Sequence, residues 1–581
     1  MKSYINCLLV SGALLMTAGL ASCVKDLDQM PKDDRTTTAA EFKNNPRMYL
    51  GGVLGKCYSG IAVSGQDGST SSDISGLDMG RSCWSRAIFM LNEFTTDECN
   101  WIWKDSGIFD LCTNTWSENN ENIFGTYSRL LTHIAICNDF LRLTSPESLE
   151  TFEIPVGGEG DKAISQKEID QFRLEARALR GLSYFYLIDL FGNSVKCWDD
   201  QLTGEEPPYA TRAELFKLLT DDLEDVLSKF PDAKPIYGRI GKDAVEALLV
   251  KYYINSEVFA GEKMFDKCLK HCQSIFARHT GGFNGSGLAY DYQSLFCRNN
   301  DMFAPGGSLS DQNEILWNIP YEYQLCESYG GSSFLILGAI SDQNKAAMSW
   351  YGINGQWTCM HARQQFSEKF SFSGGVSNDK RTYLWLTEND DFTISNNDFS
   401  NYKHGYVPIK FTNVNCQADG RMPYWTDPET GLNRVGVYDI NKPKENYGID
   451  ATATFADTDL PVIRLAEIYL TAAEAIVRGG GDLELAKTYV NYVRERAGVP
   501  AWSVSDLSLD KLLDERAREL YWENCRRTDL VRFGKFTSGY DWTWKKNLPG
   551  GSDISSYMNL FPIPTQVINS YKSEYPQNPG Y

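Results

Sequence analysis

The sequence is poor in the residues from which most metal and nucleic-acid sites are built. It has five histidines in 581 residues and neither an HExxH nor a CxxC motif, so a zinc site has little material. Positive charge is also scarce, because 56 lysines and arginines face 76 acidic residues and leave a formal net charge of -20. An acidic chain binds nucleic acid and anionic membrane surfaces poorly, and we expect neither as a partner.

The fifteen cysteines lack the paired spacing of a disulfide framework. Cys7 and Cys23 belong to the N-terminal segment discussed next, and the thirteen that remain are an odd number. Cys268 and Cys272 are one helical turn apart, which suits packing as well as bonding. We expect most of these thiols to be small buried hydrophobic side chains.

Long apolar runs are missing after the first 22 residues, so no later segment is expected to span a bilayer. Residues 1–22 combine Lys2 with a short apolar core, as a secretory signal peptide does. They end at Leu20-Ala21-Ser22 before Cys23, which is the pattern of a bacterial lipobox. We predict cleavage before Cys23, lipidation of that residue, and a tether over residues 23–40. The alternative is an ordinary secretory signal beside a coincidental cysteine.

The most regular pattern lies between residues 459 and 536. Apolar residues from Leu465 to Ile476 recur at three- and four-residue steps, which predicts an amphipathic helix. Asp459 and Pro461 are expected to start this helix, and the glycines at 479–481 to end it. A second helix follows, capped by Asp482 and stopped by Gly498. Such a pair is typical of a tetratricopeptide hairpin, which must stack on others to bury its apolar face.

Further helical patterns cover residues 123–143, 169–191, 211–230, 242–260 and 262–278, and Thr211-x-x-Glu214 predicts a capping box. Residues 280–455 are instead rich in glycine, asparagine and aromatics, and we expect short strands and functional loops there. The predicted fold is mainly α, a tetratricopeptide-like scaffold of about four helix pairs with a large loop-rich, ligand-binding insertion. The expected parts are 41–280 with a ligand-contacting loop near 78–106, 281–457, and 458–581.

Five stretches carry a family resemblance: the lipobox followed by VKDLDQMP, FRLEARALRGLSYFYLIDLFG, RLAEIYLTAAEA, ERARELYWENCRRTDLVRFGKF, and the ending LFPIPTQVINSYKSEYPQNPGY. Together they resemble the SusD/RagB family of outer-membrane nutrient-binding lipoproteins, over essentially the whole mature chain. The resemblance implies a lipid-anchored, non-catalytic protein at the cell surface. It also implies a TonB-dependent outer-membrane transporter as partner, over which the lipoprotein acts as a lid.

Two more stretches, NEFTTDECNWIWKDS and YGGSSFLILG with NGQWTCMHARQQFSEKF downstream, resemble the starch-binding members of that family. The match implies that Trp103, Tyr329 and Trp357 form an arc of rings for an α-1,4-glucan. It also implies that Asp78 and Arg86 hydrogen-bond sugar hydroxyls. Stacking suits this role because the C–H face of a pyranose packs on an aromatic ring, while its hydroxyls need directed partners.

Two departures from those members affect the expected site. Ser106 stands where they have an asparagine, so one hydroxyl contact is expected to be weaker. Gln356 lengthens the loop before Trp357 by one residue and could shift that ring. Trp101, two residues before Trp103, we assign to the core.

Two clusters of charged residues have different interpretations. Asp301 and Asp459 match positions associated with calcium in the starch-binding members, so the resemblance implies a structural calcium ion there, and no other cofactor is expected. Eight charged residues near the C-terminus have helical spacing and predict a structural ion-pair network rather than a catalytic centre: Glu515, Arg516, Arg518, Glu519, Arg526, Arg527, Asp529 and Arg532.

The leading hypothesis is therefore a surface lipoprotein that captures starch and delivers it to a transporter. A second keeps that role but changes the ligand to another glycan or a peptide. A third is a glycoside hydrolase, which needs two carboxylates about 5 to 10 Å apart across a cleft. No spacing in the sequence selects such a pair.

Overall fold

The computed structural model describes residues 43–65, 68–201, 204–339, 351–428, 431–436, 453–572 and 574–581. The predicted signal peptide, Cys23 and the predicted tether over residues 23–40 lie outside these residues, so all three stay predictions. The chain forms two compact units, one from residues up to Val53 with Leu143–Asp170, and one from Leu54–Arg142 with Gln171–Tyr581. Every site discussed below lies within the second, larger unit.

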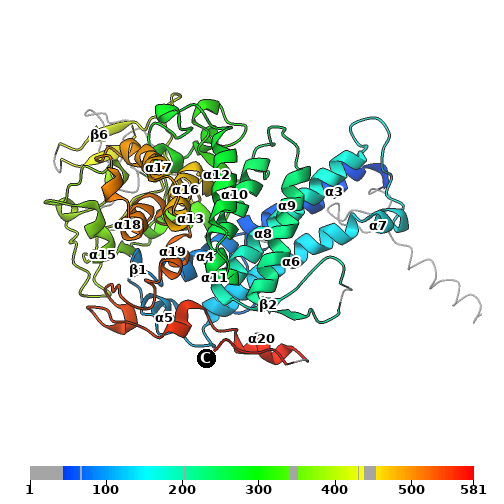
Figure 1. Cartoon of the computed structure of the whole chain (residues 1–581), viewed down its shortest axis with the longest axis horizontal. Helices are drawn as coiled ribbons and strands as arrows, with labels where there is room; N and C mark the ends of the chain where they lie inside the picture. Colours follow the sequence, from blue (N-terminus) through cyan, green and yellow to red (C-terminus); the bar gives the residue numbers. More distant parts are fainter. Residues whose placement is uncertain are drawn as a thin grey trace, which may run out of the picture. The chain divides into compact units, whose positions relative to one another are not determined.

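The described residues are mainly helical, with seventeen α-helices and eight short strands (Figure 1). The helices are α3 (Pro46–Ala62), α4 (Trp84–Asn92), α5 (Ile108–Cys112), α6 (Glu121–Leu143), α7 (Pro146–Thr151), α8 (Gln166–Phe191), α9 (Arg212–Lys229), α10 (Lys242–Ile254), α11 (Ser256–Ala260), α12 (Phe265–Phe276), α13 (Gly331–Ala339), α15 (Gln364–Ser367), α16 (Leu465–Gly479), α17 (Leu483–Arg496), α18 (Leu509–Leu520), α19 (Arg526–Arg532) and α20 (Thr565–Ser570). The strands are β1 (Cys99–Trp101), β2 (Ser194–Val195), β3 (Tyr209–Ala210), β4 (Ile315–Ile319), β5 (Met360–Ala362), β6 (Tyr424–Thr426), β7 (Asn433–Val435) and β8 (Leu460–Arg464). Each described helix is too short or too polar to cross a membrane.

Several helix ends follow from local chemistry that is visible in the sequence. Thr211 and Glu214 form the predicted capping box at the start of α9. Asp482 accepts hydrogen bonds from the first turn of α17, and Gly480 ends α16 in the left-handed conformation. These caps satisfy backbone groups that a helix leaves unpaired at its ends, and they confirm those boundaries.

The helices of the larger unit stack side by side in pairs. α10 packs against α9 and α12, α12 packs against α16, and α16 packs against α17 (Figure 1). The face of α16 that carries Leu465, Ile468 and Ala472 is fully buried. The prediction that the C-terminal hairpin must stack on other helices is therefore confirmed.

The predicted start of α16 is wrong. Asp459 and Pro461 do not initiate the helix, which begins at Leu465. Residues 460–464 instead form β8, which pairs antiparallel with β4, Leu460 opposite Ile319. The partner strand lies about 140 residues earlier in the chain, so nothing local to Asp459 could indicate the pairing.

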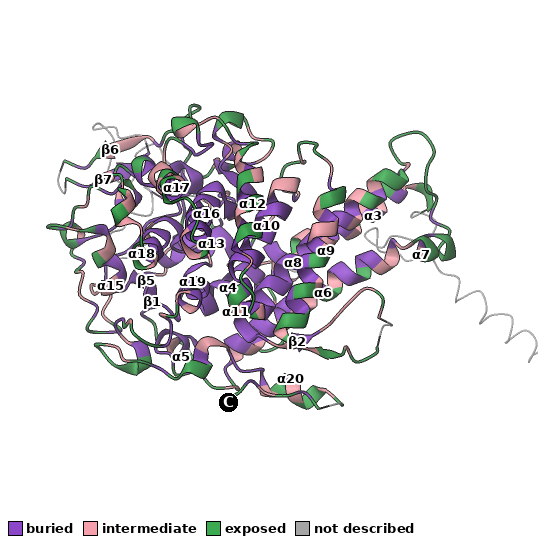
Figure 2. Ribbon diagram, in the orientation of Figure 1, coloured by how far each residue is buried: buried purple, intermediate pink, exposed green. Residues whose placement is uncertain are grey.

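Between β4 and β8 the described chain consists of short strands, turns, three 3₁₀ segments and the short helices α13 and α15. Most aromatic side chains here face the interior, and the buried residues form a continuous core within the larger unit (Figure 2). The loop-rich character expected for this stretch is confirmed.

The thirteen cysteines in the described part of the chain are all free, and eleven are buried. This confirms that they act as small core side chains rather than as a disulfide framework.

The charged residues near the C-terminus form a buried ion-pair network, as predicted, but their partners are mostly distant in sequence. Glu515 binds Arg381 at 2.8 Å and Arg518 at 2.6 Å, and it also binds Arg494. Burial alone would raise the pKa of Glu515, but these guanidinium groups hold it well below its ordinary value. Helical spacing accounts for the Arg518 contact alone, so the network joins separate elements rather than lining one helix face.

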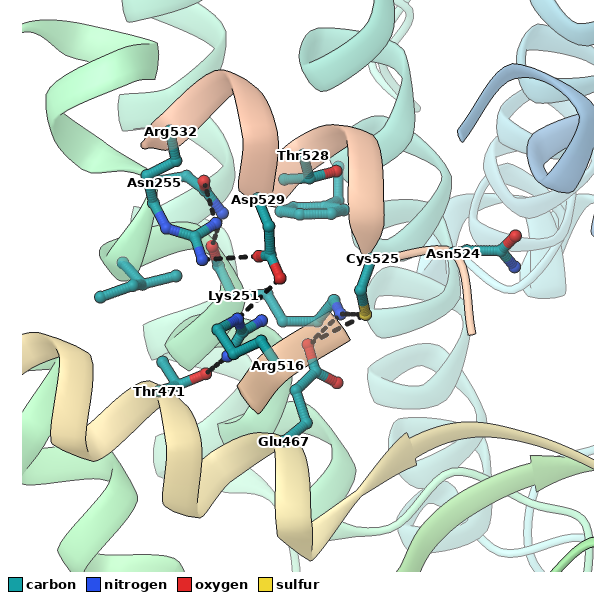
Figure 3. A pocket seen from close by; sticks show the side chains of 12 residues that line it. Lys251, Asn255, Glu467, Thr471, Arg516, Asn524, Cys525, Thr528, Asp529 and Arg532 are labelled. Atoms are coloured by element: carbon teal, nitrogen blue, oxygen red, sulfur yellow. Dashed lines mark hydrogen bonds and ion pairs between the residues drawn. The ribbon is translucent and has the colours of Figure 1, made fainter. Parts of the chain in front are cut away.

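A second part of this network is drawn in Figure 3. Arg516 binds Asp529 at 2.7 Å, Arg532 binds it at 2.6 Å, and Lys251 binds Glu467 at 2.5 Å. The space between these groups is about 10 Å³, which is no more than one water occupies. The cluster is therefore a structural tie and not a binding site.

Candidate functional site

Pairing of β1 with β5 brings two distant tryptophans together. Trp101 lies opposite Met360, and the Ile102 N–H donates to the Cys359 carbonyl at 2.8 Å. Because the strands are antiparallel, the chain after β1 and the chain before β5 continue alongside one another. Trp103 and Trp357 lie on those two continuations.

The third ring, Tyr329, reaches the same place through α13. Tyr329 lies two residues before the first residue of that helix. At its other end, the Leu337 carbonyl accepts a 2.7 Å hydrogen bond from the Trp357 N–H. One short helix therefore fixes the segments that carry both Tyr329 and Trp357.

The rings form a connected series whose planes are inclined to one another. The Tyr329 and Trp357 centroids are 6.1 Å apart at 38°, Trp357 and Trp101 are 6.5 Å apart at 65°, and Trp101 and Trp103 are 5.6 Å apart at 81°. Trp103 is 44% exposed whereas Trp101 is only 1% exposed. Trp101 is thus a core residue, as expected, but it also links the rings. We call Trp103, Trp101, Trp357 and Tyr329 the ring platform.

Arg86 lies beneath this platform, in the first turn of α4. Its guanidinium carbon is 5.5 Å from the Trp101 ring and 5.4 Å from the Trp357 ring, and its Nη1 donates to the Tyr329 carbonyl at 3.3 Å. Burial lowers the pKa of Arg86 to about 10, so the group stays charged at neutral pH. Gly80 permits this arrangement, because a Cβ there would lie 2.5 Å from Arg86 Nη1.

Asp78 is held at the rim by its own turn. Its Oδ1 accepts hydrogen bonds from the Gly80 and Arg81 N–H groups, each at 2.8 Å, and Arg81 Nε donates to Oδ2. Burial would raise the pKa of Asp78, but the bonds from Arg81 and the charge of Arg86 lower it. Asp78 is therefore an ionised acceptor, and it lacks the raised pKa that a general acid needs.

The turn between β1 and α5 carries Trp103 and Ser106. Trp101 Nε1 donates to Asp105 Oδ2 at 2.9 Å, and the Asp105 carbonyl accepts from the Ile108 and Phe109 N–H groups at the start of α5. Ser106 is exposed within this turn. Asp105 thus joins both ends of the turn on which Trp103 stands.

All six residues expected to bind ligand line one depression of about 540 Å³: Asp78, Arg86, Trp103, Ser106, Tyr329 and Trp357. Its volume is typical of small-molecule sites. Met79, Arg81, Trp101 and Asp105 line it as well, and the family match identified none of them as ligand-binding. Arg81 and Asp105 adjoin residues of the match, and only the folded turns show that their side chains face the depression. The depression offers inclined rings, one buried guanidinium and an ionised carboxylate, which together suit a polyhydroxylated ring.

The two candidate calcium ligands lie elsewhere, beside β4 and β8. Asp459 Oδ1 accepts from the Tyr321 N–H at 3.0 Å, and Oδ2 accepts from Asn318 Nδ2 and the Tyr237 hydroxyl. Burial raises the pKa of Asp459 to about 7, and the Asp301 carboxylate adds to that effect.

The charges and oxygens around Asp459 are compatible with a calcium ion. Within the described residues no cation pairs with Asp459 or Asp301, and no set of three or more acidic, histidine or cysteine side chains surrounds a metal position. Asn318 Oδ1 is buried and accepts no hydrogen bond from the described part of the chain. Two carboxylates and a neutral oxygen are a donor set that calcium accepts, provided that further neutral oxygens complete it.

Comparison with known proteins identifies the family. Residues 376–581 match the model described as the SusD family. The starch-binding protein SusD of Bacteroides thetaiotaomicron is 30% identical, over 99% of this chain and 98% of that one.

Solved structures agree in fold. A SusD superfamily protein from Bacteroides vulgatus has a TM-score of 0.61 at 18% identity, covering 92% of this chain and 99% of that one. Surface glycan-binding protein A from Bacteroides thetaiotaomicron, in complex with laminarihexaose, has a TM-score of 0.59 at 18% identity with the same coverage. Identity of 30% over nearly the full length of both chains is decisive, and the chain belongs to the SusD family.

Proposed function

We propose that this protein captures starch, an α-1,4-glucan, at the cell surface and delivers it to a TonB-dependent outer-membrane transporter. Members of its family bind glycans without catalysing a reaction, so the glycoside hydrolase hypothesis is set aside. The starch assignment draws on the full-length similarity to a starch-binding relative.

The ring platform is the observation that carries the choice of ligand. Three of its rings reach the surface, Trp103, Trp357 and Tyr329, and the Tyr329 and Trp357 planes are inclined by 38°, so they present a bent surface. An α-1,4-glucan coils, whereas a β-1,4-glucan runs flat. A curved chain can contact several inclined rings at once, which a flat ribbon cannot do.

Three features complete the proposal. Cys23, once lipidated, would anchor the chain in the outer membrane. The stacked helix pairs would form a scaffold of the tetratricopeptide type that holds the platform. Asp301 and Asp459, with Asn318 Oδ1, would hold a structural calcium ion whose charge offsets the two carboxylates.

Isothermal titration calorimetry of the purified protein tests the ligand. We expect binding of maltoheptaose, tighter binding of a cyclodextrin because the ring is already curved and loses less conformational entropy, and no binding of cellohexaose. Equal affinity for cellohexaose would contradict the starch proposal.

A β-1,3-glucan is the second candidate ligand, because one structural neighbour is described in complex with laminarihexaose. Laminarihexaose belongs in the same titration series. Preferential binding of laminarihexaose over maltoheptaose would transfer the assignment from starch to a β-1,3-glucan.

A further inference from the structure

The larger unit carries a second depression, of about 420 Å³, that shares no lining residue with the ring platform. One wall is the connection between α17 and α18, and the other is the turn formed by residues 369–379. Trp502 lines it and is half-buried. We call it the Trp502 depression.

Trp502 is held in place by a side-chain clamp from α17. The backbone N–H of Trp502 donates to Asn491 Oδ1 at 2.7 Å, and the backbone carbonyl of Trp502 accepts from Asn491 Nδ2 at 2.9 Å. A single amide group thus binds both sides of the Trp502 peptide. The backbone of the residue is fixed without help from a ligand.

The ring is supported in the same way. The guanidinium carbon of Arg494 is 4.7 Å from the centre of the Trp502 ring. Arg494 in turn donates to the Pro500 carbonyl at 2.9 and 2.8 Å and pairs with the buried Glu515. The indole is therefore ordered before any partner arrives, and a ligand that stacks on it pays little to immobilise it.

Two polar groups of the depression lack partners within the described chain. Both hydrogen bonds of Trp502 use its backbone, so the indole N–H donates to no described group. Asn378 is exposed on the opposite wall, and its side-chain amide forms no hydrogen bond with the described residues. An indole N–H and a carboxamide can satisfy both donor and acceptor hydroxyls.

The electrostatics select an uncharged ligand. Lys369 pairs with Asp514 at 2.6 Å, and Lys511 pairs with Asp506 at 2.8 Å. Arg494 and Arg518 share Glu515. Each cation that lines the depression is held in an ion pair, which weakens its attraction for a phosphate, a sulfate or a uronic acid.

We propose that the Trp502 depression is a second glycan-binding site, where one pyranose ring of a neutral polysaccharide stacks on Trp502 and bonds to Asn378. This proposal depends on the proposed function only in that the protein captures a polysaccharide, and it does not require that polysaccharide to be starch. Two sites on one protein would bind one long chain with avidity, whereas a short oligosaccharide would occupy the ring platform alone.

Affinity electrophoresis in gels containing amylopectin, laminarin or pectate tests this with the whole soluble protein. We expect Trp502→Ala to weaken binding to the neutral polysaccharide that retards the wild type by about three- to tenfold. Its affinity for the matching heptasaccharide should stay within about twofold by calorimetry. Trp103→Ala should keep a weak retardation that the double variant Trp103→Ala/Trp502→Ala loses.

Two variants control for folding. Asn378→Ala should also weaken polysaccharide binding, and it breaks no side-chain hydrogen bond among the described residues, so we expect it to stay folded. Tyr290→Ala removes a ring that is 43% exposed and lines neither depression, and it should migrate like the wild type.

The outcomes separate the two proposals. Wild-type retardation of both Trp502→Ala and Asn378→Ala would overturn the second site. Loss of pectate binding in those variants, with neutral polysaccharides unaffected, would overturn its neutral ligand. Retardation of the wild type by laminarin but not amylopectin would overturn the starch proposal alone, and retardation by no polysaccharide would overturn both.

Discussion

The indole N–H of Trp101 donates a 2.9 Å hydrogen bond to Oδ2 of Asp105. Trp101 is the buried member of the ring platform, and Asp105 is exposed at its rim. The bond closes the turn that carries Trp103, so Asp105 is a positioning residue for a ring that it does not need to touch.

Asp105→Ala should therefore weaken glycan binding by about threefold or more, because Trp103 loses its fixed orientation while one hydrogen bond is lost. Asp105→Asn should restore most of the affinity, since its amide oxygen still accepts from Trp101. Calorimetry with maltoheptaose measures both. A direct role for the Asp105 charge would instead leave Asp105→Asn as weak as Asp105→Ala.

The two tryptophans of this turn should separate binding from stability. Trp103→Ala should lower glycan affinity at least about tenfold, because a few exposed rings concentrate binding energy, and should change the free energy of unfolding by less than about 1 kcal/mol. Trp101→Ala should cost about 3–5 kcal/mol of stability, because Trp101 is 1% exposed. Denaturant titration gives the stabilities. Unchanged glycan binding by Trp103→Ala would remove it from the site.

The segment between α4 and β1 holds a buried carboxyl pair. Glu98 Oε2 accepts from the Trp522 N–H at 3.0 Å, and Glu93 Oε1 accepts from the Cys525 N–H at 3.1 Å. The two carboxyl groups also share a side-chain hydrogen bond with each other. Burial raises the pKa of Glu93 to about 7, and burial with the Glu93 charge holds the pKa of Glu98 well above its ordinary value, although Arg526 opposes both shifts.

The native state therefore binds more protons at this pair than the unfolded chain, starting above the ordinary glutamate value of 4.5. Its contribution to stability is present at lower pH and is lost as the pH rises toward and through about 7. Glu98→Gln keeps a neutral acceptor for Trp522, so it should equal the wild type in stability near pH 5. Near pH 8 it should exceed the wild type by about 1 kcal/mol or more.

Thermal unfolding of both proteins at the two pH values measures the effect. The matched control is Glu322→Gln, at an exposed position. Its difference in stability from the wild type should be the same at pH 5 and at pH 8. A wild type that is more stable than Glu98→Gln at pH 8 would show that the pair is ionised and paired instead.

The anchor prediction concerns Cys23, which lies outside the described residues. Cys23→Ala should give a folded protein that no longer fractionates with the outer membrane, because acyl chains supply the attachment. Membrane association of the variant that persists in high salt would rule out lipidation as the tether.

Local chemistry made several helix boundaries predictable. Thr211 and Asp482 each accept a hydrogen bond from the first turn of their own helix. The capping residue and the backbone group that it binds are therefore only a few residues apart in the sequence. β8 shows the limit, because LPVIR becomes a strand only through a partner far along the chain. Tertiary pairing overrode the helix start that Asp459 and Pro461 indicated.

The site divides in the same way. Trp103, Tyr329 and Trp357 could be identified through family motifs, while composition and spacing alone would have favoured core roles for them. The part played by Asp105 could not be predicted, because it depends on the turn placing that carboxylate against the Trp101 indole. The ion partners of Glu515 were missed for a similar reason, since Arg381 approaches from a separate loop.

The pairing of Ile319 with Leu460 has a consequence for how such proteins diversify. It pins together the entry and the exit of the intervening chain, so that chain is a closed excursion from the helical stack. Because lengthening a closed loop costs little entropy, an excursion of different length that keeps β5 and Arg381 can be exchanged without stretching α10 or α16. A graft of a relative's segment between these two residues would carry Tyr329 and Trp357 with it, and would leave Trp103 and Arg86 behind on the recipient. The residues expected to set ligand preference thus fall into two groups. Tyr329 and Trp357 can be exchanged with the segment, whereas Trp103 and Arg86 stay with the rest of the chain.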